Sequence, residues 1–254
     1  MTELPTVSEF PDCHGCARFR GGPADACLAC ASRQLIRPGP GACPACSQFL
    51  AENGRCPNEL CSSPRRRIGT IHALGYQAGA LRRAIRSYKY GGVRSWSVVL
   101  GRLLLAWVEQ NMAADPPGLI VANPTFTGAG SHSAAGPPSF AHTEAVLQAA
   151  AAADVAGRWS FDTATPAALV KTRQTLQSAD GQAWSKRASG SELREAVRIP
   201  DPRRTQGKFV IIYDDICTTG TQLNALAACL LDEGGAARVE GIVLARAPWR
   251  GTSR

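Results

Sequence analysis

The sequence predicts an α/β fold in which a parallel sheet is flanked by helices and preceded by a small Cys-rich, metal-binding module. Eight of the ten cysteines lie between Cys13 and Cys61. After Arg67, strand-like apolar segments alternate with helix-like segments, which is typical of α/β domains. One of these strands runs into two acids and a turn of small residues, an arrangement typical of ligand sites in open α/β sheets. We therefore divide the chain into residues 1–67 and residues 68–254.

The elements of the second part follow from hydrophobic periodicity and from turn residues. The expected strands are Ile68 to Tyr76, Leu119 to Ala122, Ala167 to Lys171, Lys208 to Tyr213 and Val239 to Ala245. The expected helices are Ala78 to Tyr90, Ser95 to Asn111, Thr143 to Val155 and Thr219 to Gly234. The stretch from Thr172 to Pro200 is polar and basic and shows no convincing period.

Composition limits the class of protein. Hydrophobic residues make up 44% and charged residues 19% of the 254 residues, enough for a normal core. No apolar run approaches the length of a bilayer span, and Met1 to Phe10 is polar, so we expect a cytoplasmic protein without a membrane span. The formal net charge is +8, and two zinc–thiolate sites would lower it to about +4. Basicity is therefore weak support for a nucleic-acid partner.

The cysteines of the first part have the spacing of zinc ligands. A Cys-x-x-Cys turn places two sulfurs at two corners of a tetrahedron, and two such turns complete a closed Cys₄ site. The segment also has too few large apolar residues to fold without a staple. Pairing neighbours gives two structural Zn²⁺ sites, and a crossed pairing is the alternative. The expected ligands are Cys13, Cys16, Cys27 and Cys30 for one site and Cys43, Cys46, Cys56 and Cys61 for the other.

The segment from Phe209 to Thr221 carries the most specific chemistry. Its apolar strand leads to Asp214 and Asp215 and then to a turn that enters a helix. Free backbone N–H groups at such a helix start favour a phosphate. Paired acids repel phosphate but accept hydrogen bonds from ribose hydroxyls and bind Mg²⁺. The whole segment resembles the phosphoribosyltransferase signature; the expected contacts with 5-phosphoribosyl pyrophosphate are Asp214, Asp215, Cys217, Thr218, Thr219, Gly220 and Thr221, with Cys217 filling a small buried space.

Together with the cysteine module, this signature resembles the ComF family of phosphoribosyltransferase-like proteins, named for a role in DNA uptake and competence. The resemblance also covers the segment Tyr76–Gly91, which includes Lys89, and the stretch that begins at Lys171. It implies a type I phosphoribosyltransferase fold in which residues 119–125 form the first core strand and pyrophosphate loop. Two departures are visible: residues 123–157 contain no Lys or Arg, and the usual Arg-x-x-Asn of the family appears as Arg187-Ala-Ser-Gly190.

The resemblance implies a phosphoribosyltransferase. A nucleophile, often a nitrogen, would displace Mg²⁺-bound pyrophosphate from the sugar, with Asp214 and Asp215 as the catalytic pair that orients the ribose. Cations would neutralise the leaving pyrophosphate, and the expected ones are Lys89, Lys171, Arg173 and Arg187. The alternative is a non-catalytic adaptor in DNA uptake or DNA metabolism, in which the zinc module contacts DNA or a protein weakly and the phosphoribosyl site is a sensor or a vestige. Arg65 to Arg67, with Arg82 and Arg86, would then follow phosphates.

Overall fold

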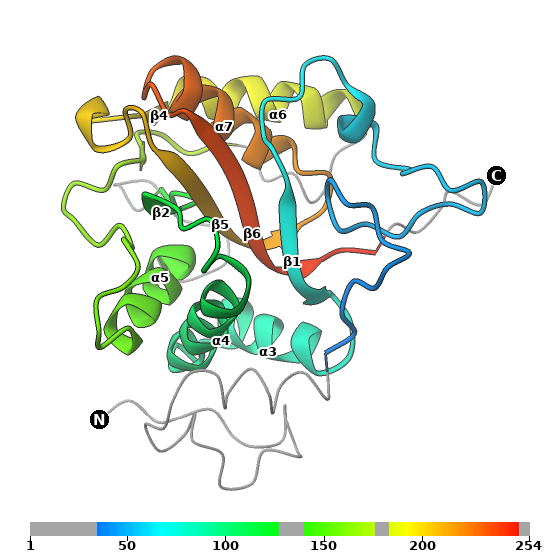
Figure 1. The fold of residues 1–254 in the computed structure, drawn as a ribbon, viewed down its shortest axis with the longest axis horizontal. Coiled ribbons are helices and arrows are strands. Elements are labelled where there is room, and N and C mark those ends of the chain that lie inside the picture. The colour runs from blue at the N-terminus through cyan, green and yellow to red at the C-terminus, as the bar shows by residue number, and fades with distance from the viewer. Residues whose placement is uncertain (1–34, 127–139, 176–182, 249–254) are drawn as a thin grey trace, which may run out of the picture.

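A four-stranded, fully parallel sheet forms the centre of the computed structural model, which describes residues 35–126, 140–175 and 183–248 (Figure 1). The side chains of residues 183–189 are not described. The spatial order of the strands is β1 (Ile71–Tyr76), β6 (Arg238–Arg246), β5 (Phe209–Cys217) and β2 (Leu119–Ala122). Because parallel neighbours need crossover connections, the helices between these strands lie on the two faces of the sheet.

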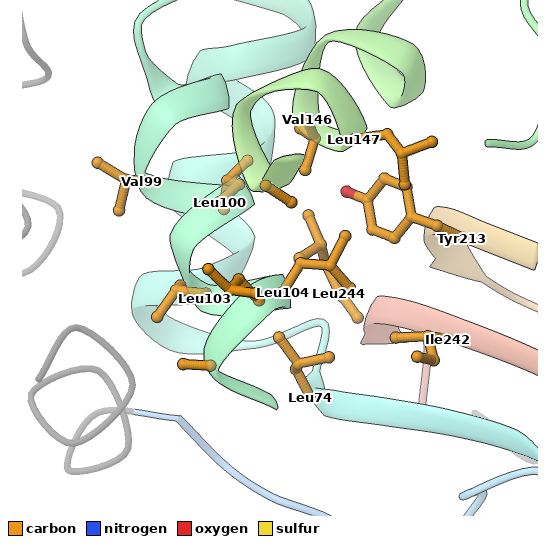
Figure 2. Close-up of a cluster of buried hydrophobic side chains, with 14 of the residues drawn as sticks. Leu74, Val99, Leu100, Leu103, Leu104, Val146, Leu147, Tyr213, Ile242 and Leu244 are labelled. Atoms are coloured by element: carbon orange, nitrogen blue, oxygen red, sulfur yellow. The ribbon is translucent and has the colours of Figure 1, made fainter. Parts of the chain in front are cut away.

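One face of the sheet is covered by helices α3 (Gly79–Tyr90), α4 (Trp96–Asn111) and α5 (His142–Ala153). Figure 2 shows the apolar side chains of α4 and α5 meeting Tyr213, Ile242 and Leu244 of the central strands. Helices α4 and α5 cross closely at Gly101, where an added Cβ would lie 2.7 Å from Ala149 Cβ and Ala150 N. A glycine is therefore required at this crossing.

The opposite face is covered by α7 (Thr221–Asp232), against which α6 (Ala183–Ala196) lies. A two-stranded antiparallel ribbon of β3 (Val170–Lys171) and β4 (Val197–Arg198) extends this layer, and the 3₁₀ turn η4 (Pro202–Arg204) precedes β5. The buried cluster on this face also contains the side chains of Cys43 and Cys46. The Cys-rich segment thus contributes to the core of the second face.

Residues 35–67, which contain the 3₁₀ turn η2 (Glu59–Ser62), lie directly against strand β1. Backbone hydrogen bonds join Ile71 N to Ala45 O at 3.0 Å and Tyr76 N to Ile36 O at 2.7 Å. The ring of Phe49 stacks on that of Tyr76 with centroids 3.9 Å apart. This part of the first segment therefore shares its core with the sheet.

The predicted fold class is confirmed: the domain is a parallel α/β sheet flanked by helices, with a Cys-rich cluster near its N-terminal side. Strand β2 has the predicted bounds, whereas β5 is longer than predicted and includes both acids. The stretch with no convincing period contains helix α6, which sequence reasoning missed. None of the helices within the described ranges has the length and apolarity to cross a bilayer.

Candidate functional site

Asp214 and Asp215 lie where β5 extends beyond its neighbour β2. The last pair between these strands is Ala122 with Tyr213, and Asn123 N donates to Tyr213 O at 2.8 Å. On the other side of β5, Asp214 is paired with Val243 and Ile216 with Ala245 of β6. The carboxyl end of β2 therefore leaves an open edge beside both carboxylates, which is where ligands bind in open α/β sheets.

Asp215 lies between two cationic side chains. Its Oδ2 atom is 2.7 Å from Lys89 Nζ, near the end of α3, and 3.1 Å from His142 Nε2, at the start of α5. Alternation along β5 places Asp215 on the same face as Tyr213, the face that α3 and α5 cover. The same alternation therefore explains why these two helices deliver its partners.

The pKa values of the group reflect this pairing. Burial alone would raise the pKa of Asp215, but the hydrogen bond from His142 and the charge of Lys89 outweigh it and lower that pKa well below its usual range. The pKa values of Lys89 and His142 are raised, because Asp215 outweighs the opposing effect of burial. Asp215 is thus ionised, and the side chains of Lys89 and His142 hold it.

Asp214 behaves in the opposite way. Its carboxylate accepts a hydrogen bond from Asp215 N at 2.9 Å. Burial, with the neighbouring charge of Asp215 as a second cause, raises the pKa of Asp214 to about 7. Neighbouring carboxyl groups whose pKa values are driven apart can take different roles, one accepting hydrogen bonds and the other able to donate one.

The turn that follows β5 presents backbone N–H groups in the manner of an anion site. Gly220 has φ +80°, and an added Cβ there would lie 2.8 Å from Ile71 Cδ1. The carbonyls of Cys217, Thr218 and Thr219 all accept hydrogen bonds from other parts of the chain. The N–H of each trans peptide points away from its own carbonyl. The N–H groups of Thr218, Thr219 and Gly220 therefore point to the opposite side, and no described residue accepts a hydrogen bond from them.

The predicted hydroxyl donors also gather at this turn. Thr219 Oγ1 lies 2.9 Å from Thr221 Oγ1, at the first residue of α7. Helix α6 approaches the same place, since a Cβ on Gly190 would lie 2.9 Å from Thr221 Cγ2. Three consecutive N–H groups, two hydroxyls and a helix N-terminus form a site suited to a phosphate. We call residues 217–221 the phosphate loop.

The other predicted phosphate contacts are distributed unevenly. Lys89 reaches the acid pair. Lys171 lies on β3, and burial, together with Arg173, lowers its pKa despite the opposing charge of Glu192. Arg173 is engaged by Glu192 and Glu195 of α6, at 3.3 and 3.2 Å. Arg187 lies in α6, but its side chain is outside the described residues, as is that of Lys186.

The segment expected to form a pyrophosphate loop holds a carboxylate of its own. Glu144 of α5 accepts hydrogen bonds from Thr125 N at 2.6 Å and Thr125 Oγ1 at 3.0 Å. Thr143 Oγ1 donates to Asn123 O at 2.7 Å. The N–H group of Thr125 thus already donates a hydrogen bond to Glu144. It is therefore not free to donate to a pyrophosphate oxygen in this structure.

Four of the predicted zinc ligands form one cluster: the sulfur atoms of Cys43, Cys46, Cys56 and Cys61 all lie within 4.8 Å of one another. The Sγ distances are 3.7 Å for Cys46–Cys56, 3.7 Å for Cys56–Cys61 and 3.9 Å for Cys43–Cys61. A tetrahedral Zn²⁺ with Zn–S bonds of about 2.3 Å requires edges of about 3.8 Å. The cluster therefore fits a zinc ion. The other predicted set, Cys13, Cys16, Cys27 and Cys30, lies outside the described residues.

Thiol pKa values in the cluster differ. Burial raises the pKa of Cys56 to about 11 and that of Cys61 further. Burial would also raise the pKa of Cys46, but the charge of Arg246 and hydrogen bonds from neighbouring groups, Asn58 among them, together outweigh burial and lower this pKa to about 7. A zinc ion would displace the protons from the less acidic thiols, as metal binding to cysteine requires.

Two of the five arginines that were candidates for a DNA-binding patch have partners within the fold. Arg66 donates from Nε to Ile68 O at 2.9 Å and from its terminal nitrogen to the carbonyls of Ala45 and Gly69. Arg67 forms an ion pair with Asp232 of α7. These two side chains tie the Cys-rich segment to the sheet and to α7. Arg82 and Arg86 are exposed on α3.

Two residues of this site were missed by sequence reasoning. His142 is the first residue of an alanine-rich helix, and only its position in a stretch without Lys or Arg distinguishes it. Arg246 ends strand β6 and is fully buried behind the phosphate loop. No local pattern identifies either residue, because their partners lie far away in the sequence.

Comparison with known proteins adds little. No protein-family model and no curated protein matches the sequence. A hypoxanthine phosphoribosyltransferase from Staphylococcus aureus is among the solved structures with a similar arrangement, at 14% identity and a TM-score of 0.32. The match covers 59% of this chain and 62% of that chain, which is less than two thirds of that enzyme's length. At this TM-score the match supports no assignment of function to this chain.

Proposed function

We propose that this chain binds 5-phosphoribosyl pyrophosphate with Mg²⁺ and transfers the phosphoribosyl group to an acceptor, with release of pyrophosphate. The observation that carries the proposal is the phosphate loop directly beside a buried acid pair. A phosphate ester of a sugar needs both features: N–H and hydroxyl donors for the phosphate, and acceptors for the ribose hydroxyls. The distance along the chain is short, since Asp215 and Thr218 are separated by two residues.

The roles follow from the protonation states. Ionised Asp215 would accept hydrogen bonds from a ribose hydroxyl, with Asp214 beside it as the second ribose contact. Thr218, Thr219, Gly220 and Thr221 would hold the 5′-phosphate. The carboxylate oxygens of the acid pair are also ligands that suit Mg²⁺, which when bound would neutralise charge on pyrophosphate.

The reaction would be a displacement at the anomeric carbon. The lone pair of the acceptor, often a nitrogen, forms the new bond to that carbon. The bond to the pyrophosphate oxygen breaks, its electron pair leaves with pyrophosphate, and the acceptor releases a proton. The chain contributes positioning and charge stabilisation. Lys89, which is 2.7 Å from Asp215, is the described cation best placed to meet the leaving group, with Lys171, Arg173 and Arg187 proposed as further contacts.

Isothermal titration with 5-phosphoribosyl pyrophosphate and Mg²⁺, followed by an assay of released pyrophosphate, tests this function. The wild type should bind, and the double variant Asp214→Asn, Asp215→Asn should not. Asp115→Asn is a matched control, because Asp115 is an exposed acid whose ion pair, within the described part of the chain, is with Arg238 at the surface. Absence of binding by the wild type at millimolar ligand would rule out the site.

The cellular process in which this chain takes part is proposed from the family resemblance. A ComF-like role in DNA uptake rests on the family resemblance described for the sequence, and the zinc module would be the contact for a DNA or protein partner. The use of Arg66 and Arg67 inside the fold leaves less free positive charge on that module. We therefore expect only weak, salt-sensitive DNA binding, measurable by fluorescence anisotropy over a salt series.

A further inference from the structure

The phosphate loop is held from behind by the Cys-rich segment and by one buried arginine. Arg246 donates from one terminal nitrogen to Cys217 O at 3.0 Å, to Cys217 Sγ at 2.8 Å and to Thr218 O. Asn58 Nδ2 donates to Thr219 O at 3.0 Å. Three consecutive carbonyls of the loop are therefore fixed on one side. This is what directs the following N–H groups to the side where a phosphate would bind.

Both of these residues also contact the zinc cluster. The other terminal nitrogen of Arg246 lies 3.7 Å from Cys46 Sγ. Asn58 is buried, lies between the ligands Cys56 and Cys61, and hydrogen-bonds to Cys46. A third link is Gln48 Nε2, which donates to Ala247 O at 3.0 Å, while Ala247 N donates to Cys217 O at 2.9 Å. The two direct connections between loop and cluster thus each pass through one side chain, that of Arg246 or that of Asn58.

The charge of Arg246 gives the connection an energetic basis. Its side chain is fully buried, and within the described ranges no Asp or Glu forms an ion pair with it. A buried cation without a counter-charge is strongly unfavourable. A Zn²⁺ ion with four thiolates carries a net charge of about −2, which would balance the guanidinium. With the metal removed and the thiols protonated, Arg246 would lose this counter-charge.

We propose that Arg246 and Asn58 are positioning residues that couple the zinc cluster to the phosphate loop, so that zinc and a phosphorylated sugar bind with positive cooperativity. The inference rests on the proposed function, because it concerns the same phosphate loop. Coupling between two sites is reciprocal: if zinc raises the affinity for the sugar phosphate, the sugar phosphate raises the affinity for zinc by the same factor. Zinc in this chain then has a part in substrate binding as well as in folding.

The test uses the zinc-loaded full chain and ribose 5-phosphate, a probe that would reach the acid pair and the phosphate loop without pyrophosphate. Zinc release to a coloured chelator is followed with and without the probe. Saturating ribose 5-phosphate should lower the amount of zinc released at equilibrium, corresponding to about tenfold tighter binding of one zinc ion per chain, within the usual range of coupling between sites. A residue with only a structural role would not make zinc release depend on the sugar phosphate.

The key variant is Asn58→Ser, in which a shorter side chain can no longer reach Thr219 O but can still accept the hydrogen bond that Leu60 N donates to Asn58 at 3.3 Å. It should bind ribose 5-phosphate about fivefold more weakly, the effect of one lost hydrogen bond. It should also lose most of the protection of zinc by the probe. Arg246→Lys should show the same loss to a greater degree, because an ammonium group cannot span both carbonyls and the thiolate.

Asn53→Ser is the matched control, because Asn53 is exposed in the same segment and, among the residues that the structure describes, its side chain accepts a hydrogen bond only from Arg55 N, at 3.0 Å. It should behave like the wild type. If the wild type binds ribose 5-phosphate while zinc release stays unchanged, the coupling is refuted and the proposed function survives. If the wild type binds neither ribose 5-phosphate nor 5-phosphoribosyl pyrophosphate, the coupling and the proposed function are both refuted.

Discussion

The two faces of the central sheet are closed by different means. The face under α3, α4 and α5 is filled by apolar side chains such as Leu100, Leu104 and Leu244 (Figure 2). The other face is covered by α7 and α6, and its cluster also includes the thiols of Cys43 and Cys46. Burial of apolar area stabilises the first face without a ligand, whereas the second face includes a group of thiols that suits a metal ion.

The candidate site lies where these two faces meet. Lys89 and His142 reach Asp215 from helices of the apolar face. The phosphate loop is fixed by Arg246 and Asn58 from the thiol-containing face. Because these partners come from different faces, Asp215 should keep Lys89 and His142 in the absence of metal. The phosphate loop, by contrast, should lose its shape when the metal is removed. The predictions below separate the two contributions.

The largest effect is expected from the double variant Cys43→Ser, Cys46→Ser. Structural zinc supplies roughly 10–16 kcal/mol of apparent free energy to zinc-finger peptides, so residues 42–62 should lose their order. Hydrogen exchange should show lost protection in those residues and at Ala247, whose N–H donates to Cys217 O of the phosphate loop at 2.9 Å, while α4 stays protected. Cys229→Ala is the control, because Cys229 is a buried thiol outside the cluster. Protection of the Ala247 amide equal to that of the wild type would show that the metal does not support the loop.

A substitution at Gly101 should destabilise the packing of α4 against α5 on the apolar face of the sheet. A larger side chain would meet α5, since even a Cβ would lie 2.7 Å from Ala149 Cβ and Ala150 N. Gly101→Leu should lower the free energy of unfolding by about 3 kcal/mol, at the upper end for an overpacked core, with zinc content unchanged. Gly39→Leu provides the comparison, because no atom lies within 4 Å of a Cβ at that position. Chemical denaturation measures both, and equal midpoints would contradict the tight crossing.

Asp214 should make the ligand-free protein less stable as pH rises. Its pKa is about 7 in the fold and about 3.9 in an unfolded chain. Between those values the folded state binds more protons than the unfolded state, so stability falls with increasing pH. Asp214→Asn should remove this dependence and be more stable than the wild type at pH 8, by on the order of 4 kcal/mol, because each pKa unit is worth about 1.4 kcal/mol. Melting curves from pH 4 to 8 test this, and an Asn variant with an unchanged pH slope would contradict it.

The smallest effect is expected at the exposed ion pair between Arg67 and Asp232. It joins the Cys-rich segment to α7, but its side chains are 44% and 34% exposed. Exposed pairs of this kind contribute about 0–1 kcal/mol, so Arg67→Ala should change the melting temperature very little and leave the zinc content unchanged. A loss of several kcal/mol would mean that charge pairs, and not the thiol cluster, attach this segment to the sheet.

Sequence reasoning predicted the elements whose own pattern is strong. Strand β2 has the predicted bounds and α4 differs by one residue, because each is a nearly continuous apolar segment ended by turn residues. Helix α6 was missed because its sequence is polar and basic and shows no convincing period. Of residues 190–196, whose side chains are described, Gly190, Leu193 and Ala196 are buried, a pattern too short for hydrophobic periodicity to identify.

The candidate site also contains residues that a local pattern identifies and residues that it does not. Asp214, Asp215 and the small-residue turn are contiguous, so a motif could identify them. Their partners are not: His142 and Arg246 meet the motif only through the sheet, from opposite faces. The strand order β1-β6-β5-β2 brings Arg246 beside Cys217, and no local pattern specifies that order. Sequence reasoning therefore singled out the contiguous acids and turn, and did not identify the distant side chains that hold them.

The most direct test of the account is the amide NMR spectrum of the zinc-loaded, ¹⁵N-labelled protein titrated with ribose 5-phosphate. The account predicts downfield shifts of the Thr218, Thr219 and Gly220 amide protons, because a phosphate would accept hydrogen bonds from these three N–H groups. Amides of α4, around Gly101, should not move. Shifts confined to another place, such as the arginines Arg83 and Arg86 that line a shallow cavity at the end of α3, would contradict the assignment of residues 217–221 as the phosphate site.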